Sequence, residues 1–169
     1  KEKAVAEDVF KASTALYAYD KGELNARVEE TASTEGSSLE KVTFDAAYGR
    51  ERVTAYLFLP KDASPPFQAV VYYPGVFAFF DDKLDLSMAE ESRGFLVKSG
   101  RAFIFPIYKG MYERRDDFQP YASPPAFRRD HVLMWAKDLG RSLDYLETRN
   151  DIDGTKIGYF GDSLGGMQG

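Results

Sequence analysis

Gly161, Ser163 and Gly165 form a G-x-S-x-G pattern close to the last residue of the sequence. A serine in this pattern becomes a nucleophile when it occupies a strained turn between a buried strand and a helix, which exposes its hydroxyl. The context fits, because the apolar run 156–160 comes directly before the pattern. A Cβ two positions before or after the serine would clash with backbone in so tight a turn, which gives both glycines a steric reason. The pattern therefore predicts that Ser163 is a nucleophile.

Two other interpretations of the stretch Gly161–Gly166 stay open. Without its context the pattern is weak, because it occurs by chance in roughly one chain in twenty of this length. The stretch is then an ordinary glycine-rich turn from strand to helix. The other alternative is a loop that cradles phosphate, although no lysine follows the glycines as it does in a Walker motif.

Nucleophilic catalysis on an acyl group also needs backbone N–H groups that point at the developing oxyanion. The residue after the nucleophile supplies one of them, and here that residue is Leu164. The second comes from the loop after the third strand of such a sheet, and we assign it to the N–H of Val76. Phe77 and Tyr108 are predicted to line the substrate pocket, since they follow the carboxyl ends of two buried strands.

The other polar candidates point to weaker hypotheses. Arg114 and Arg115 are candidates for binding an anionic substrate, with a solvated charged loop as the alternative. Asp151 and Asp153 lack the spaced oxygens and terminal glutamate of a calcium loop, so no metal site is predicted. The chain has no cysteine and a single histidine, His131, which lies upstream of the serine and is expected to have a structural or surface role.

The elements expected to position the site begin with two β-branched and aromatic runs, 41–47 and 52–59, which predict an antiparallel hairpin. Three later runs, 68–73, 102–107 and 156–160, are nearly continuous in apolar residues. Such runs are typical of parallel strands that are covered on both faces. The alternation of these strands with helices predicts an α/β fold whose sheet is mostly parallel after an antiparallel start.

Two helices are predicted between these strands, one at 84–99 and one that begins near Ser123. The second helix has an apolar stripe, with Arg141 and Asp144 on its opposite, polar face. The stripe consists of Val132, Ala136, Leu139, Leu143 and Leu146.

The first part of the chain predicts a shorter amphipathic helix at 5–19, which packs on or links to another element. A small, polar, unpatterned stretch at 31–38 predicts a surface loop. We therefore expect an N-terminal helix and linker at 1–38 and a main domain at 39–169.

Composition limits the partners of this 169-residue chain. Hydrophobic residues make up 44% and charged residues 29%, which is typical of a globular domain. The formal charge of −5 gives no general attraction to nucleic acid or to anionic membranes. No run reaches the roughly 18 apolar residues of a membrane span. We expect neither nucleic acid nor membrane as a partner, predict no cofactor, and make no prediction of the cellular compartment.

Seven stretches together resemble the α/β-hydrolase superfamily, in its dienelactone-hydrolase, acetyl-xylan-esterase and prolyl-oligopeptidase-like branches. The resemblance runs from about Lys41 to the end of the chain and implies the α/β-hydrolase fold. The stretches are Ala47–Gly49, Leu57–Pro60, Val71–Gly75, Asp138–Leu146, Asp151–Asp153, Lys156–Tyr159 and Gly161–Gly166.

In that fold the catalytic residues follow the order serine, then aspartate or glutamate, then histidine. The sequence ends six residues after Ser163, so we expect the acid and the base outside this chain. The resemblance implies the first part of a serine hydrolase fold, with the missing C-terminal half in the same or another chain. It implies cleavage of a small carboxylic ester through an acyl-enzyme. The alternative is a non-catalytic binding or regulatory module, because Tyr108–Arg114 is similar to hydrolase modules fused behind bacterial protein kinases.

Overall fold

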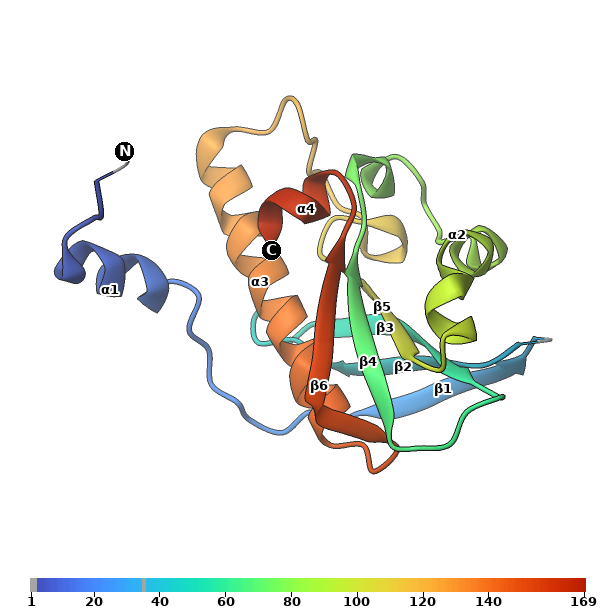
Figure 1. The fold of residues 1–169 in the computed structure, drawn as a ribbon. Helices are drawn as coiled ribbons and strands as arrows, with labels where there is room; N and C mark the ends of the chain where they lie inside the picture. Colours follow the sequence, from blue (N-terminus) through green and yellow to red (C-terminus); the bar gives the residue numbers. More distant parts are fainter. Residues whose placement is uncertain (1–2, 35) are drawn as a thin grey trace.

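The computed structural model describes residues 3–34 and 36–169, which form one six-stranded sheet with helices on both faces (Figure 1). The strand order across the sheet is β1-β2-β3-β5-β4-β6. The strands are β1 (Arg27–Ser33), β2 (Ser37–Asp45), β3 (Arg52–Pro60), β4 (Phe67–Tyr73), β5 (Ala102–Ile107) and β6 (Ile152–Gly161). The helices are α1 (Glu7–Ala15), α2 (Leu86–Lys98), α3 (Pro125–Glu147) and α4 (Leu164–Gln168), with 3₁₀ turns η1 (Val76–Phe79) and η2 (Tyr112–Arg114).

The sheet is mixed, as the sequence predicts. Strands β1, β2, β3 and β5 pair antiparallel in succession, whereas β4 pairs parallel with both β5 and β6. It follows that β2, β4, β5 and β6 all point the same way. The carboxyl ends of β4, β5 and β6 therefore meet at one edge of the sheet, which is where α/β sheets place their ligands.

Two apolar layers hold the helices on this sheet. Helices α3 and α4 lie on one face and α2 on the other (Figure 1). Val71 and Ile104 are fully buried on the α3 face, while Tyr72 and Phe103 turn to the α2 face. Because neighbouring residues of a strand point to opposite faces, continuous apolar runs are what a sheet covered on both sides requires. Each such buried side chain contributes about 1.5–3 kcal/mol.

Local signals in the sequence explain where α2 begins and ends. The Asp85 carboxylate accepts hydrogen bonds from the N–H groups of Ser87 and Met88, which caps the first turn. Gly100 follows the helix with φ at +82°, a conformation that favours glycine and stops the helix. The helix predicted at 84–99 is thus confirmed, with both ends moved inward.

The face of α3 that was predicted to be polar is buried at two positions. Arg141 donates hydrogen bonds to the carbonyls of Asp45, Gly22 and Glu23, and Asp144 accepts one from the hydroxyl of Tyr19. The chain before β1 crosses this face of α3, so the charged groups bind backbone and side chains instead of water. Arg141 and Asp144 thus belong to the predicted polar face of α3, but the preceding segment of the chain buries them.

The N-terminal region differs from its predicted form. Every residue of α1 is exposed, so the helix forms but its apolar stripe packs on no described part of the chain. The predicted loop at 31–38 is wrong, because residues 31–33 end β1 and residues 37–38 begin β2. Residues 1–2 and 35 of the predicted linker lie outside the described residues. Hydrogen bonding to β2 overrides the weak β propensity of this polar stretch.

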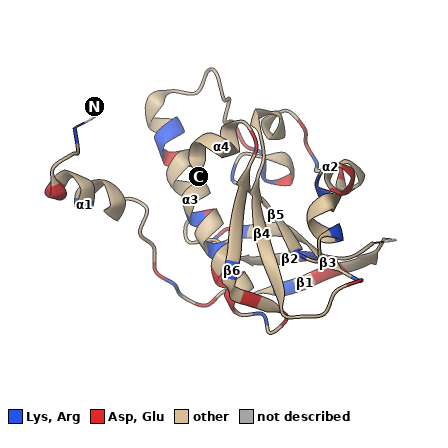
Figure 2. Ribbon diagram, in the orientation of Figure 1, with Lys and Arg blue, Asp and Glu red and all other residues tan. Residues whose placement is uncertain are grey.

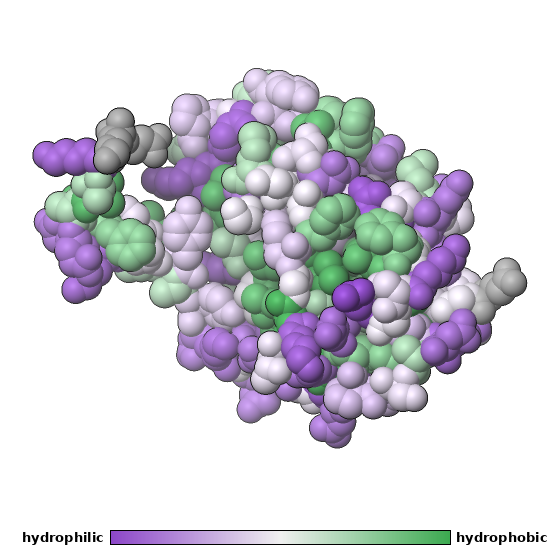
Figure 3. Space-filling view, in the orientation of Figure 1, coloured by the Kyte–Doolittle hydropathy of each residue, from purple (hydrophilic) through white to green (hydrophobic). Residues whose placement is uncertain are grey.

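Strand β6 is an outer strand of the described sheet, and this corrects the prediction that it is buried on both faces. Tyr159 and Phe160 are each 38% exposed, and β6 pairs only with β4 among the described strands. Figure 3 shows hydrophobic side chains gathered on the side where β6 lies. An open, apolar strand edge of this kind can accept another strand.

Charged side chains of both signs are interspersed over the ribbon (Figure 2). No helix in the described part of the chain has the length and apolar character needed to cross a bilayer.

Candidate active site

Ser163 occupies the tight turn between β6 and α4, and we call residues 161–165 the elbow. Its backbone has φ +50° and ψ −105°, which is an uncommon conformation for a residue with a side chain. Such strain persists only where the surroundings hold it, and it concentrates at functional sites. The side chain of Ser163 is exposed at the carboxyl edge of the sheet. The structure thus gives Ser163 the position and the strain that the sequence predicts.

At the two glycines of the pattern, separate segments of backbone approach each other closely. A Cβ on Gly161 would lie less than 3.0 Å from the backbone of Gly165 and Gly166. A Cβ on Gly165 would lie less than 3.0 Å from the carbonyl of Tyr73 at the end of β4. Neither backbone can move without opening the turn, so the predicted steric reason for both glycines is confirmed.

The loop between β4 and η1 lies against the elbow. A Cβ on Gly75 would stand 3.4 Å from the Cβ of Ser163, which places the two residues next to each other. Val76 and Leu164 are the first residues of η1 and α4, where N–H groups have no partner inside their own helix. Within residues 3–34 and 36–169, neither of these two N–H groups donates a hydrogen bond to backbone or side chain.

One cavity of about 390 Å³ brings the three principal predicted residues together, since Ser163, Leu164 and Val76 all line it. The rest of its wall is mainly apolar and includes Trp135 and Val132 of α3. Such a concave, largely apolar site with a few polar groups is typical of small-molecule binding.

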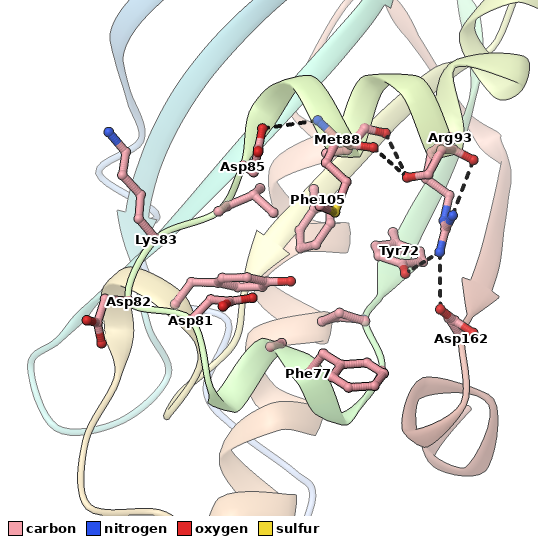
Figure 4. A pocket seen from close by; sticks show the side chains of 17 residues that line it. Tyr72, Phe77, Asp81, Asp82, Lys83, Asp85, Met88, Arg93, Phe105 and Asp162 are labelled. Atoms are coloured by element: carbon pink, nitrogen blue, oxygen red, sulfur yellow. Dashed lines mark hydrogen bonds and ion pairs between the residues drawn. The ribbon is translucent and has the colours of Figure 1, made fainter.

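The two predicted pocket residues lie elsewhere. Phe77 is 76% exposed and lines a neighbouring cavity of about 460 Å³, between η1 and α2 (Figure 4). Tyr108 is fully buried, and its hydroxyl donates to the carbonyl of Tyr72 at 3.0 Å. Burial raises the pKa of Tyr108 well above its usual value. Tyr108 lines neither cavity, because it points back beneath β4 instead of out from the sheet edge, and its assignment to the pocket is corrected.

His131 has the structural role that was expected. It is buried in α3, with Nδ1 2.9 Å from the carbonyl of Phe127 and Nε2 3.0 Å from the carboxylate of Asp116. It lines neither of the cavities beside the elbow. Nδ1 thus contacts the preceding turn of α3 itself, whereas Nε2 ties the loop that carries Asp116 to the helix.

Arg114 is not solvated, because its side chain is buried in a network of hydrogen bonds. Its guanidinium is buried and donates to Asp138 at 2.6 Å, to the hydroxyl of Tyr48 at 2.8 Å and to the carbonyl of Ile107. Burial raises the pKa of Asp138, and the Arg114 guanidinium offsets part of that shift. This buried network, which sequence reasoning missed, ties η2 to α3.

Each of the remaining charged candidates forms an ion pair with another side chain. Arg115 pairs with Asp82, Asp151 with Arg149, and Asp153 with Lys156. In the described part of the chain, no group of three or more His, Cys, Asp or Glu side chains is placed to hold a metal ion.

Arg93 is a further residue beside the elbow for which the sequence carries no signal. It comes from α2 and binds the carboxylate of Asp162, the residue directly before Ser163 (Figure 4). The two residues are 69 positions apart in the chain, so only the folded structure brings them together.

No protein-family model matches the chain, and no curated protein matches its sequence. Solved structures do match it. A putative acetyl xylan esterase from Bacteroides fragilis superposes with a TM-score of 0.75 at 15% identity, over 96% of this chain and 47% of that one. An acetyl xylan esterase from Paenibacillus sp. R4 gives a TM-score of 0.67 at 18% identity, over 99% and 55%. A glucuronoyl esterase from Solibacter usitatus gives 0.55 at 17% identity, over 86% and 47%.

These esterases are α/β hydrolases, and they superpose on nearly the whole of this chain. The chain spans about half the length of these structures. At this level of identity the likeness establishes the fold alone. The chain therefore has the α/β-hydrolase fold.

Proposed function

We propose that the protein is a serine hydrolase that cleaves a carboxylic ester through an acyl-enzyme on Ser163. The observation that carries the proposal is the strained Ser163, exposed at the elbow and sharing a cavity with two unengaged N–H groups, those of Val76 and Leu164. A turn with only a structural role requires neither a strained, exposed serine nor unengaged N–H groups beside it. The esterases that share the fold support the same class of reaction.

In this reaction the Ser163 Oγ attacks the ester carbonyl carbon and its proton passes to a base. The N–H groups of Val76 and Leu164 donate to the oxyanion of the tetrahedral intermediate. The intermediate collapses, the alcohol leaves with the proton, and the acyl group stays on Ser163. Water then attacks the acyl-enzyme, which releases the carboxylic acid and restores the serine.

The base and its acid are proposed to lie outside residues 1–169, in the C-terminal half of the fold. His131 is the only histidine of the chain, and it is buried against Phe127 and Asp116. A further part of the sheet would pair with the open edge of β6, which brings its loops to the same carboxyl edge as Ser163.

The substrate is proposed to be a small ester. A cavity of about 390 Å³ accommodates a compact group, and its mainly apolar wall suits an acyl chain. Two of the matching structures are acetyl xylan esterases, and acetyl is a short acyl group, which supports this proposal.

The acyl-enzyme is testable in the full-length protein with p-nitrophenyl acetate. We expect a rapid release of about one p-nitrophenolate per protein, followed by slower turnover, as acylation outpaces deacylation. Acid quenching during the rapid phase should leave an acetyl group on the peptide that contains Ser163, detected by mass spectrometry. The Ser163→Ala variant should show neither the rapid phase nor the acetyl group.

Turnover without acetylation of Ser163, or turnover that persists in Ser163→Ala, would contradict this mechanism. Complete absence of turnover and acetylation with a range of small esters would instead support a non-catalytic binding or regulatory module that keeps the elbow.

A further inference from the structure

We propose that Arg93 is a positioning residue that holds the elbow of Ser163 through the carboxylate of Asp162. This inference rests on the proposed function, since it concerns the reactivity of the same serine. Arg93 lies on α2, on the face of the sheet opposite to α3 and α4 (Figure 1). It does not line the cavity of Ser163, and its hydrogen bonds go to Ser92, Tyr72 and Asp162.

Arg93 is itself held in place by aromatic rings. Its guanidinium carbon is 4.8 Å from the centre of the Tyr72 ring and 5.7 Å from that of Phe160. Nη2 donates to the Tyr72 hydroxyl at 2.7 Å and to the Asp162 carboxylate at 3.2 Å (Figure 4). The side chain is only 19% exposed. A planar guanidinium packed on rings is pre-organised, so it loses little further freedom when it binds a carboxylate.

Asp162 is fixed at both ends of its backbone as well as through its side chain. Its N–H donates to the carbonyl of Tyr73 at 3.0 Å, and its own carbonyl accepts from the N–H of Gly165 at 2.8 Å. The bond to Arg93 adds a third anchor, from a helix on the other face of the sheet. Because Ser163 comes next and has φ +50°, these anchors hold the strained conformation in place.

The same ion pair neutralises a charge near the oxyanion loop. A Cβ on Gly75 would stand 3.9 Å from an oxygen of the Asp162 carboxylate, so that carboxylate lies beside the residue that precedes Val76. An unpaired carboxylate there would oppose the negative charge that develops on the substrate oxygen. Arg93 thus both anchors Asp162 and offsets part of its charge.

The experiment measures kcat and KM of the full-length protein with p-nitrophenyl acetate. Arg93→Met keeps much of the packing volume but loses charge and donors. We expect kcat to fall about tenfold, since small displacements of a reacting group are costly, while KM changes less than threefold. Arg93→Lys should recover part of the loss. Arg101→Met is the matched control, because Arg101 is exposed and follows the same helix, and it should leave both constants unchanged.

A double variant separates positioning from a general structural role. Arg93→Met combined with Asp162→Asn should be no slower than Arg93→Met alone, because both changes remove one interaction. Independent effects would instead multiply. If Arg93→Met does not fold, kcat and KM are measured instead for Arg93→Lys, for Asp162→Asn and for the double variant that combines these two substitutions.

Hydrogen exchange of the peptide 161–166 gives a readout that does not depend on activity. It should be faster in Arg93→Met than in wild type and unchanged in Arg101→Met. An unchanged kcat and unchanged exchange in Arg93→Met, with active wild type, would overturn the role of Arg93. A wild type without Ser163-dependent hydrolysis would instead overturn the proposed function, and the exchange rates would then show separately whether Arg93 holds the elbow.

Discussion

Replacing Val76 with proline is expected to lower kcat for ester hydrolysis by about 10²–10³, because it removes one N–H donor to the oxyanion. The local backbone can accept proline here, so the substitution should remove the N–H without distorting the loop. Val76 is the first residue of η1, a position that proline accepts well. The preceding Gly75 has φ −72° and ψ 178°, which is the extended conformation that a residue before proline adopts. The fold should therefore survive the loss of the donor.

The control for this prediction is Val76→Ala, which trims the side chain in the cavity but keeps the N–H. It should retain kcat within threefold, and both variants should be reported with their melting temperatures. A well-folded Val76→Pro protein that loses less than about threefold in kcat would place the second donor elsewhere. The N–H of Phe77 is then the next candidate, since the Tyr108 hydroxyl is bonded to the carbonyl of Tyr72.

Adding a methyl group to Gly165 is expected to lower kcat/KM about a hundredfold or more, because it forces the elbow to open. The new Cβ would overlap the carbonyl of Tyr73, which is backbone in β4 and cannot step aside. Overpacking of this kind costs about 1–3 kcal/mol or more, so the melting temperature of Gly165→Ala should fall as well.

The neighbouring Gly166 provides a matched control on the same short helix. A Cβ there would meet only the carbonyl of Gly161, at 3.6 Å, which is ordinary contact. Alanine also favours helix over glycine by about 1 kcal/mol, so Gly166→Ala should keep its activity and be no less stable. Equal effects of the two substitutions would show that the crossing at Gly165 does not control the elbow.

Local patterns predicted most of the elements that carry this site. The apolar runs at 68–73 and 102–107 are confirmed as β4 and β5, and the hairpin 41–59 as β2 and β3. Ser163, Leu164 and Val76 come together as predicted, because each follows directly from the end of a strand or the start of a helix. These features depend on residues close to one another in the chain.

What the sequence could not predict depends on contacts between distant segments. Burial of Arg114 requires Asp138 on another element, and burial of Arg141 requires the carbonyl of Gly22. From the sequence alone, a charged residue is expected to be exposed to solvent unless its buried partner is known.

The central claim is that Ser163 is an activated nucleophile, and covalent labelling tests it most directly. A fluorophosphonate probe should react with the full-length protein, and peptide mass spectrometry should find the probe on Ser163, because a serine paired with a base is the most reactive hydroxyl available. Prior treatment with heat should abolish the reaction. The Ser163→Ala variant should take up no probe. Labelling that persists in Ser163→Ala, or a folded wild type that takes up no probe at all, would contradict the account.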